Sequence, residues 1–262
     1  MFQQAVDLRE EGEDLYAFLV NLDESRWSRK TPFNGWSVNQ VVQHLHGADR
    51  AAVRSLQDPD GFRQSLGDEA RASSVSAPAD EPPPERAELL DVWWSYFCDM
   101  CELLGNADPS LRVPWFGPDM GVRMFTTARQ METWSHAQDI YDLYEFKRSN
   151  TDRLKNVAVI GVRTFGWTFV NRQMNVPTDI PFVRLSSPSG ALWEWNDPSD
   201  SNFVEGAAVD FCHVVTQGRN IGDVDLNVVG DTATLWMSIA QCFAGPPKDP
   251  PAIGARFCPG YP

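Results

Sequence analysis

Apolar side chains recur about every 3.6 residues through most of the first 146 positions, a spacing that predicts amphipathic helices. Ser37 suits the N-cap of the second helix, and the apolar stripe that follows it continues to Leu45. Four helices of this kind favour a four-helix bundle. The predicted helices cover residues 3–22, 38–56, 84–105 and 122–146.

Two segments between these helices break the pattern. Residues 58–85 are rich in Pro, Ser, Ala and Asp, which predicts a long connection with a short helix inside it. Residues 111–121 contain too many prolines and glycines for a helix, so we expect a loop. Its Trp115 and Phe116 suggest that this loop packs against another part of the chain.

The periodicity changes after residue 150. A helix is predicted over 151–173, a hairpin of two strands over 182–195, a helix over 206–217, a strand over 226–229 and a helix over 232–243. A chain of 262 residues suits two domains, and its 42% hydrophobic content is enough to fill both cores. The predicted fold is therefore α+β, with a four-helix bundle over 1–150 and a small α/β domain over 151–262.

The charge balance limits the partners. The chain has 36 acidic and 22 basic residues, giving a formal charge of −14, which repels nucleic acid and anionic membranes. The sequence shows neither a signal-peptide pattern nor an apolar run of about 20 residues, the length that spans a bilayer. We therefore expect a cytoplasmic protein that binds neither nucleic acid nor membrane.

The five cysteines are an odd number, scattered along the chain, which argues against a disulfide framework. Cys98 and Cys101 have the spacing of half a zinc knuckle. They lie in an apolar helical run without a second such pair, so core packing is favoured over metal or redox chemistry.

The candidate chemistry lies in the histidines and one glutamate. Glu132 and His136 are four residues apart, so a helix places both side chains on one face, where they could share a metal ion. The same spacing also produces ordinary side-chain contacts between exposed residues. His44 is on the apolar side of its helix and could be a third ligand or a core histidine, whereas His46 points elsewhere. Two nitrogens and one oxygen would leave positions open, as a catalytic metal site requires.

Four motifs in this order resemble the DinB-like, mycothiol-dependent maleylpyruvate isomerase-like proteins, and the resemblance covers almost the entire chain. It implies a metal-binding four-helix bundle followed by a sterol-carrier-like α/β domain. The motifs are residues 35–45 (GWSVNQVVQHL), 112–118 (RVPWFGP), 131–139 (METWSHAQD) and 240–246 (AQCFAGP).

The resemblance implies that His44, Glu132 and His136 hold a divalent metal, usually zinc in the isomerase. Its better-studied members use a low-molecular-weight thiol such as mycothiol as cosubstrate. A thiol bound to a metal ionises near neutral pH, and the thiolate can attack an electrophilic small molecule. The expected function is a metal-dependent thiol transferase or isomerase, with sulfur-containing natural-product biosynthesis as a specialised version. A metal hydrolase and a non-enzymatic binding module are the alternatives.

Other residues are candidates for supporting roles. Asp49 and Asp139 could orient a ligand or act in catalysis, or they could be buried structural carboxylates. Trp36 and Trp115 could line the cofactor cavity, although aromatic side chains also fill cores.

Arg219 is a candidate for binding a substrate carboxylate or the thiol cofactor. The family usually has two adjacent arginines here, and this chain has Gly218 at the first position. Gly47, where relatives carry a bulkier residue, could enlarge the cavity. Some superfamily members dimerise, which makes a homodimer possible, although no coiled-coil heptad is present.

Overall fold

The computed structural model describes residues 1–72 and 86–256. The chain divides into two compact units, Met1–Ala137 and Gln138–Pro262. The division falls within one long helix, before the boundary expected at residue 150. Within the described ranges, every helix is too short or too polar to cross a membrane.

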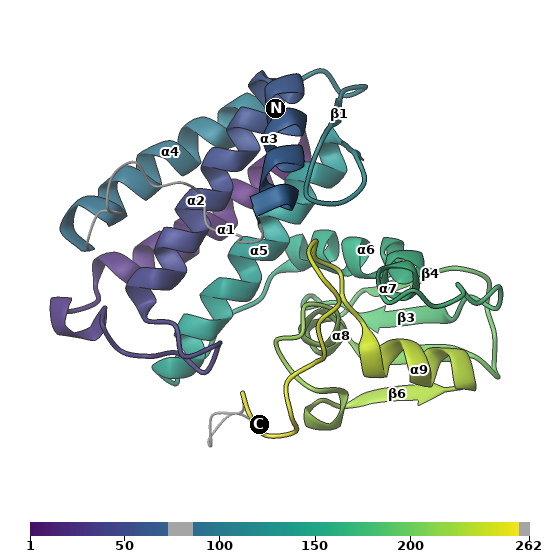
Figure 1. Ribbon diagram of the computed structural model, residues 1–262. Coiled ribbons are helices and arrows are strands. Elements are labelled where there is room, and N and C mark those ends of the chain that lie inside the picture. Colours follow the sequence, from purple (N-terminus) through teal and green to yellow (C-terminus); the bar gives the residue numbers. More distant parts are fainter. Residues whose placement is uncertain (73–85, 257–262) are drawn as a thin grey trace. The chain divides into compact units, whose positions relative to one another are not determined.

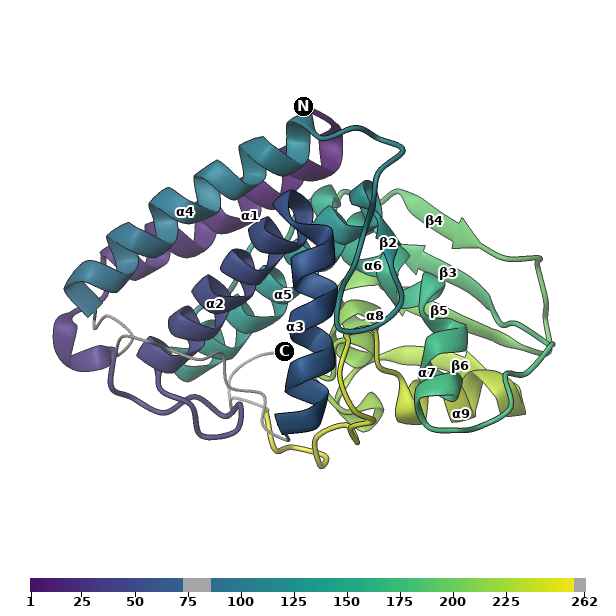
Figure 2. The ribbon, with the colours of Figure 1, turned by 45° about the horizontal axis from the view of Figure 1, so that its top comes forward.

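The first unit contains the expected bundle of long helices, so the predicted fold class is confirmed (Figures 1 and 2). Helix α4 packs against both α1 and α2. The four long helices are α1 (Gln3–Val20), α2 (Val38–Gln57), α4 (Arg86–Asn106) and α5 (Val122–Leu143). The smaller elements are η1 (Glu24–Arg26), α3 (Pro59–Ala72), β1 (Arg112–Val113) and β2 (Met120–Gly121).

The segment predicted as a connection with a short helix inside it contains a helix of 14 residues. Helix α3 occupies Pro59–Ala72, and the rest of the predicted connection lies outside the described residues. Phe62 explains why this stretch folds: its side chain is buried and stacks on Trp115. The long-range contact outweighs a local composition that favours turns.

The start of α2 forms as its sequence predicts. Ser37 and Gln40 make a reciprocal capping box: the Ser37 hydroxyl accepts from the Gln40 amide at 3.2 Å, and the Gln40 side chain accepts from the Ser37 amide at 2.9 Å. The apolar stripe that follows is fully buried. It contains Val38, Val41, Val42 and Leu45. This packing fixes the rotation of α2, and with it the direction of His44.

Alanine substitutions at two helical glycines of this unit should change the stability of the protein in opposite directions. A Cβ at Gly12 would lie 2.1 Å from the ring of Phe97, so Gly12→Ala should destabilise the protein by about 1–3 kcal/mol. A Cβ at the exposed Gly47 meets nothing within 4 Å, so Gly47→Ala should stabilise it by about 0.5–1 kcal/mol. Urea unfolding of both variants measures the difference. Equal effects would contradict the close packing of α1 on α4.

The second unit contains a four-stranded sheet with helices, and its strands are ordered β4-β3-β5-β6 (Figure 2). Strand β3 pairs antiparallel with β4 and parallel with β5, and β6 pairs antiparallel with β5. Helix α8 packs on β3 and β5, and α6 packs on α8. The strands are β3 (Phe182–Ser186), β4 (Leu192–Trp195), β5 (Phe203–Ala207) and β6 (Leu226–Val229). The helices are η2 (Asp152–Leu154), α6 (Lys155–Arg163), α7 (Phe165–Asn171), α8 (Ala208–Val215), η3 (Ile221–Asp223) and α9 (Asp231–Ile239).

The hairpin, the last strand and the helices of this unit were predicted, with two differences. The helix expected over 151–173 is divided at Thr164, whose hydroxyl donates to the carbonyl of Ile160 at 2.7 Å and of Gly161 at 3.1 Å. Strand β5 was missed, and the helix expected from residue 206 begins at Ala208. Strand β5 forms because β3 and β6 pair with it on both sides, which local sequence does not reveal.

Candidate metal centre

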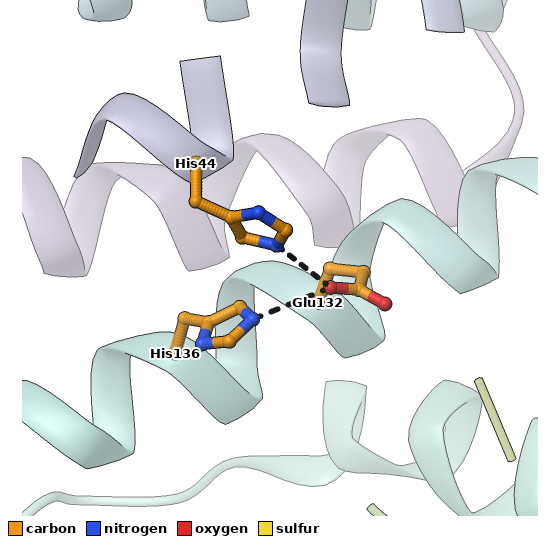
Figure 3. A group of neighbouring side chains, drawn as sticks. All are labelled: His44, Glu132 and His136. Carbon is orange, nitrogen blue, oxygen red and sulfur yellow. Dashed lines mark ion pairs between the residues drawn. The ribbon is translucent and has the colours of Figure 1, made fainter. Parts of the chain in front are cut away.

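Three side chains of the first unit converge from two helices. His44 projects from α2, and Glu132 and His136 project from consecutive turns of α5 (Figure 3). The Nε2 atom of His44 lies 3.7 Å from Oε2 of Glu132, and Nε2 of His136 lies 3.4 Å from the same oxygen. One donor atom from each residue falls within 4.8 Å of the others. The structure thus joins the pair on α5 to a histidine more than 80 positions away.

The separation of these donors fits a divalent metal ion. Tetrahedral zinc with bonds of about 2.0–2.1 Å holds its ligand atoms roughly 3.4 Å apart, close to the two histidine–glutamate distances. His136 is almost completely buried, whereas the side chains of His44 and Glu132 remain 38% and 24% exposed. A metal held here would therefore keep an accessible side, which a catalytic site needs and a closed structural site lacks.

The two imidazoles favour the ionised form of Glu132. Burial by itself would raise the pKa of this carboxyl group, but His136 and His44 hold the pKa well below its ordinary value. The carboxylate is the form that binds a metal, so Glu132 is ready to coordinate near neutral pH.

An aromatic turn lies against the two histidines. Asn34 and Gly35 both have positive φ, of 50° and 65°, as a type I′ turn requires, and the Trp36 amide donates to the Phe33 carbonyl at 2.9 Å. The ring of Phe33 lies 5.0 Å from His136, and the ring of Trp36 lies 5.2 Å from His44. The turn therefore shields one side of the histidine pair with apolar surface.

Trp36 was a candidate from the sequence, whereas Phe33 was missed. The Asn-Gly pair was the available signal, because it is the preferred sequence for the turn that positions both rings. Trp115 has a different setting: it packs on Phe62, Phe116 and Phe125 in an aromatic cluster. Its part in cofactor binding stays a prediction.

Asp49 is buried and receives three hydrogen bonds. Arg129 donates to it from Nε at 3.2 Å and from Nη2 at 2.8 Å, and the indole of Trp93 donates at 3.2 Å. Burial raises the pKa of Asp49, and the nearby Arg129 and Trp93 oppose that shift. Neither Arg129 nor Trp93 was singled out from the sequence. The available signal for Arg129 was its position one helical turn before Glu132.

Asp139 and Arg219 belong to the second unit, and each faces an oppositely charged partner there. Both terminal nitrogens of Arg219 lie 2.7 Å from the carboxylate oxygens of Asp142. Asp139 lies 3.6 Å from Nη1 of Arg256. All four side chains are buried. These pairs favour a structural role for both residues in the second unit, and their catalytic roles stay predictions.

The described cysteines form no disulfide. Cys98, Cys101, Cys212 and Cys242 are unbridged, and Cys258 lies outside the described residues. Cys101 is fully buried, and burial raises the pKa of its thiol far above the ordinary value. A group held in the thiol form is a poor nucleophile and a poor metal ligand.

Comparison with known proteins finds relatives that match most of this chain. Two uncharacterized proteins of Mycobacterium tuberculosis, from strains H37Rv and CDC 1551, are each 37% identical over 246 residues, covering 92% of this chain and 95% of theirs. A crystal structure of the mycothiol-dependent maleylpyruvate isomerase matches with a TM-score of 0.50 at 12% identity. It covers 81% of this chain and 87% of the isomerase, and shows a shared fold.

The family comparison confirms the resemblance inferred from the motifs. Residues 8–141 match the mycothiol maleylpyruvate isomerase N-terminal domain, a range that includes the three candidate ligands and the aromatic turn. The family match covers half of the chain, and the two relatives extend the similarity over nearly all of it. The chain belongs to the mycothiol maleylpyruvate isomerase N-terminal domain family.

Proposed function

We propose that this protein is a metal-dependent enzyme that uses a low-molecular-weight thiol, such as mycothiol, to isomerise or modify a small electrophile. The convergence of His44, Glu132 and His136, with an accessible side, is the observation that carries the proposal. The family name supports the choice of thiol and of isomerisation. Zinc is the proposed metal, because two imidazoles and one carboxylate are a common catalytic zinc set.

The residues of the centre have separate tasks. His44 and His136 would each present Nε2 to the metal, and Glu132 would present Oε2. A bound divalent metal would supply the positive charge that lets a coordinating thiol lose its proton near neutral pH. Phe33 and Trp36 would keep water away from one side of the two histidines, which strengthens electrostatic interactions there.

The proposed reaction forms and breaks one carbon–sulfur bond. The thiolate sulfur attacks an electrophilic carbon of a conjugated double bond, and the electron pair of that bond moves onto the conjugated carbonyl. Rotation about the resulting single bond, return of the electron pair and loss of the thiolate give the isomer. In a transferase the adduct instead takes up a proton and leaves as the product. Neither course needs an oxidant or a reductant.

Mass spectrometry tests this chemistry directly. Zinc-loaded protein would be incubated with mycothiol and a keto acid that has a conjugated cis double bond, such as maleylpyruvate. We expect an isomerised product or a thiol adduct that forms only when thiol, metal and protein are all present. Turnover independent of thiol would contradict the proposal, and a hydrolysed product would favour a metal hydrolase. The complete absence of turnover with several thiols and electrophiles would also count against the proposal.

Metal addition should stabilise the folded protein. Zinc that binds the folded chain in excess, at about 100 times its dissociation constant, contributes about 2.7 kcal/mol and raises the melting temperature. His44→Ala should remove most of this shift, because His44 is the ligand that links α2 to α5. Differential scanning fluorimetry of metal-free protein, with and without zinc, measures it. An equal zinc-induced shift in His44→Ala would place the bound zinc elsewhere.

A further inference from the structure

We propose that Asp49 is a positioning residue of the metal centre, which acts through Arg129 and sets the affinity for the metal. The inference rests on the proposed metal binding by His44, Glu132 and His136, but not on the thiol chemistry. Asp49 hydrogen-bonds Arg129, and it thereby binds the helix that carries Glu132 and His136.

The Asp49–Arg129 pair connects the two helices that supply the ligands. Asp49 lies on α2 five residues after His44, and Arg129 lies on α5 three residues before Glu132. At about 1.5 Å per residue, these offsets correspond to roughly 7.5 Å and 4.5 Å along the helix axes. The connection is therefore made within two turns of each ligand.

The pair has the geometry of a rigid connection. Two nitrogens of Arg129 donate to the same oxygen, Oδ1 of Asp49, and the indole of Trp93 on α4 holds the other oxygen at 3.2 Å. All three residues are at most 1% exposed. Buried, charge-assisted hydrogen bonds of this kind resist sliding of α2 along α5. Such sliding would change the distance between His44 and Glu132, and a metal site tolerates only about 0.5 Å of such error.

The pair also controls the charge beside the site. Arg129 is three residues before Glu132 on α5, so its guanidinium is carried about one helical turn from the carboxylate that would bind the metal. Next to a bound dication, the same positive charge would be repulsive. Asp49 neutralises Arg129 at 2.8 Å, so the metal would meet a balanced pair instead of an unpaired cation.

The experiment compares metal binding by the full chain and by Asp49→Asn, which keeps the shape of the side chain and removes its charge. Competition with a chromophoric chelator gives the zinc affinity, and the visible absorption of bound Co²⁺ reports the ligand geometry. We expect the affinity to fall about tenfold or more and the Co²⁺ spectrum to change, as for other residues that support metal ligands. The variant Asp49→Asn/Arg129→Gln removes both charges and should recover only the part of the loss that comes from the unpaired charge of Arg129.

Asp99→Asn is the matched control, because Asp99 is an exposed carboxylate on α4 of the same bundle. It should bind zinc like the wild type. If Asp49→Asn does not fold, Trp93→Phe keeps an aromatic ring, removes the indole hydrogen bond to Asp49 and should give a smaller change of the same sign. The proposal would be overturned if folded Asp49→Asn protein showed wild-type zinc affinity and an unchanged Co²⁺ spectrum. The same result in Trp93→Phe would overturn it where that variant replaces Asp49→Asn.

The outcomes separate this inference from the proposed function. A wild-type protein that binds no zinc overturns both. A wild-type protein that binds zinc but shows no thiol-dependent turnover contradicts the proposed reaction and leaves the role of Asp49 standing. Normal zinc binding by Asp49→Asn with intact turnover contradicts only the positioning role.

Discussion

Replacing Glu132 with alanine is expected to abolish zinc binding at micromolar concentrations and all thiol-dependent turnover. Glu132 contributes the oxygen that faces both histidines, at 3.7 Å from His44 and 3.4 Å from His136. Residues that only support metal ligands change affinity by about 10- to 100-fold, so losing a ligand itself should exceed about 100-fold. Elemental analysis of protein purified without an affinity tag, followed by zinc titration, measures the effect.

Glu132→Gln is the control for shape. It keeps the size of the side chain but offers a neutral oxygen, so zinc binding should still fall sharply while the fold is preserved. Glu102→Gln changes an exposed carboxylate on α4 and should leave zinc binding unchanged. Retention of one zinc per chain in Glu132→Ala would show that Glu132 is not a ligand, and would remove the basis of the proposed function.

Asp142→Ala should be among the most destabilising single substitutions in the second unit. Asp142 accepts from both terminal nitrogens of Arg219 at 2.7 Å and from the side-chain amide of Gln138 at 2.8 Å. The side chains of Asp142 and Arg219 are 1% and 8% exposed. Removing the carboxylate leaves a buried guanidinium without this counter-charge, at a cost of about 3–5 kcal/mol. Urea unfolding followed by circular dichroism measures the loss.

The exposed ion pair between Arg184 and Glu205, in the same unit, is the control for the buried ion pair between Arg219 and Asp142. It has the same 2.7 Å separation, but its side chains are 43% and 38% exposed, so Glu205→Ala should cost less than about 1 kcal/mol. The double variant Asp142→Leu/Arg219→Met should recover most of the stability lost in Asp142→Ala, because neither charge of this pair is left buried without its partner. If Asp142→Ala costs no more than Glu205→Ala, the Arg219 pair does not hold the structure, and Arg219 is available to a ligand.

This result bears on the role that the sequence suggested for Arg219. A clamp for a substrate carboxylate needs guanidinium nitrogens that can bind the substrate. Here both terminal nitrogens already bind Asp142, and Nη1 also donates to the Gly218 carbonyl at 2.8 Å. Any substrate bound by Arg219 must compete with a buried carboxylate, which favours a structural role.

Local patterns determined most of the helices and the α5 part of the site. The 3.6-residue spacing of apolar side chains defines α1, α2, α4 and α5 because helix faces depend only on neighbours within two turns. For the same reason, Glu132 and His136 had to share a face once α5 was helical. Ser37 and Gln40 likewise determined where α2 begins, because a capping box forms within four residues.

Only the tertiary structure decided the features that depend on distant partners. Strand β5 forms through pairing with β3 and β6, and α3 is stabilised by Phe62 stacking on Trp115. The packing of α2 brings His44 to Glu132, and the turn at Asn34 and Gly35 places Phe33 and Trp36 beside the histidines. The sequence by itself determined the chemical groups and the helices that carry them. Their convergence into one centre required long-range packing, because interactions between residues close in sequence do not set the distance between α2 and α5.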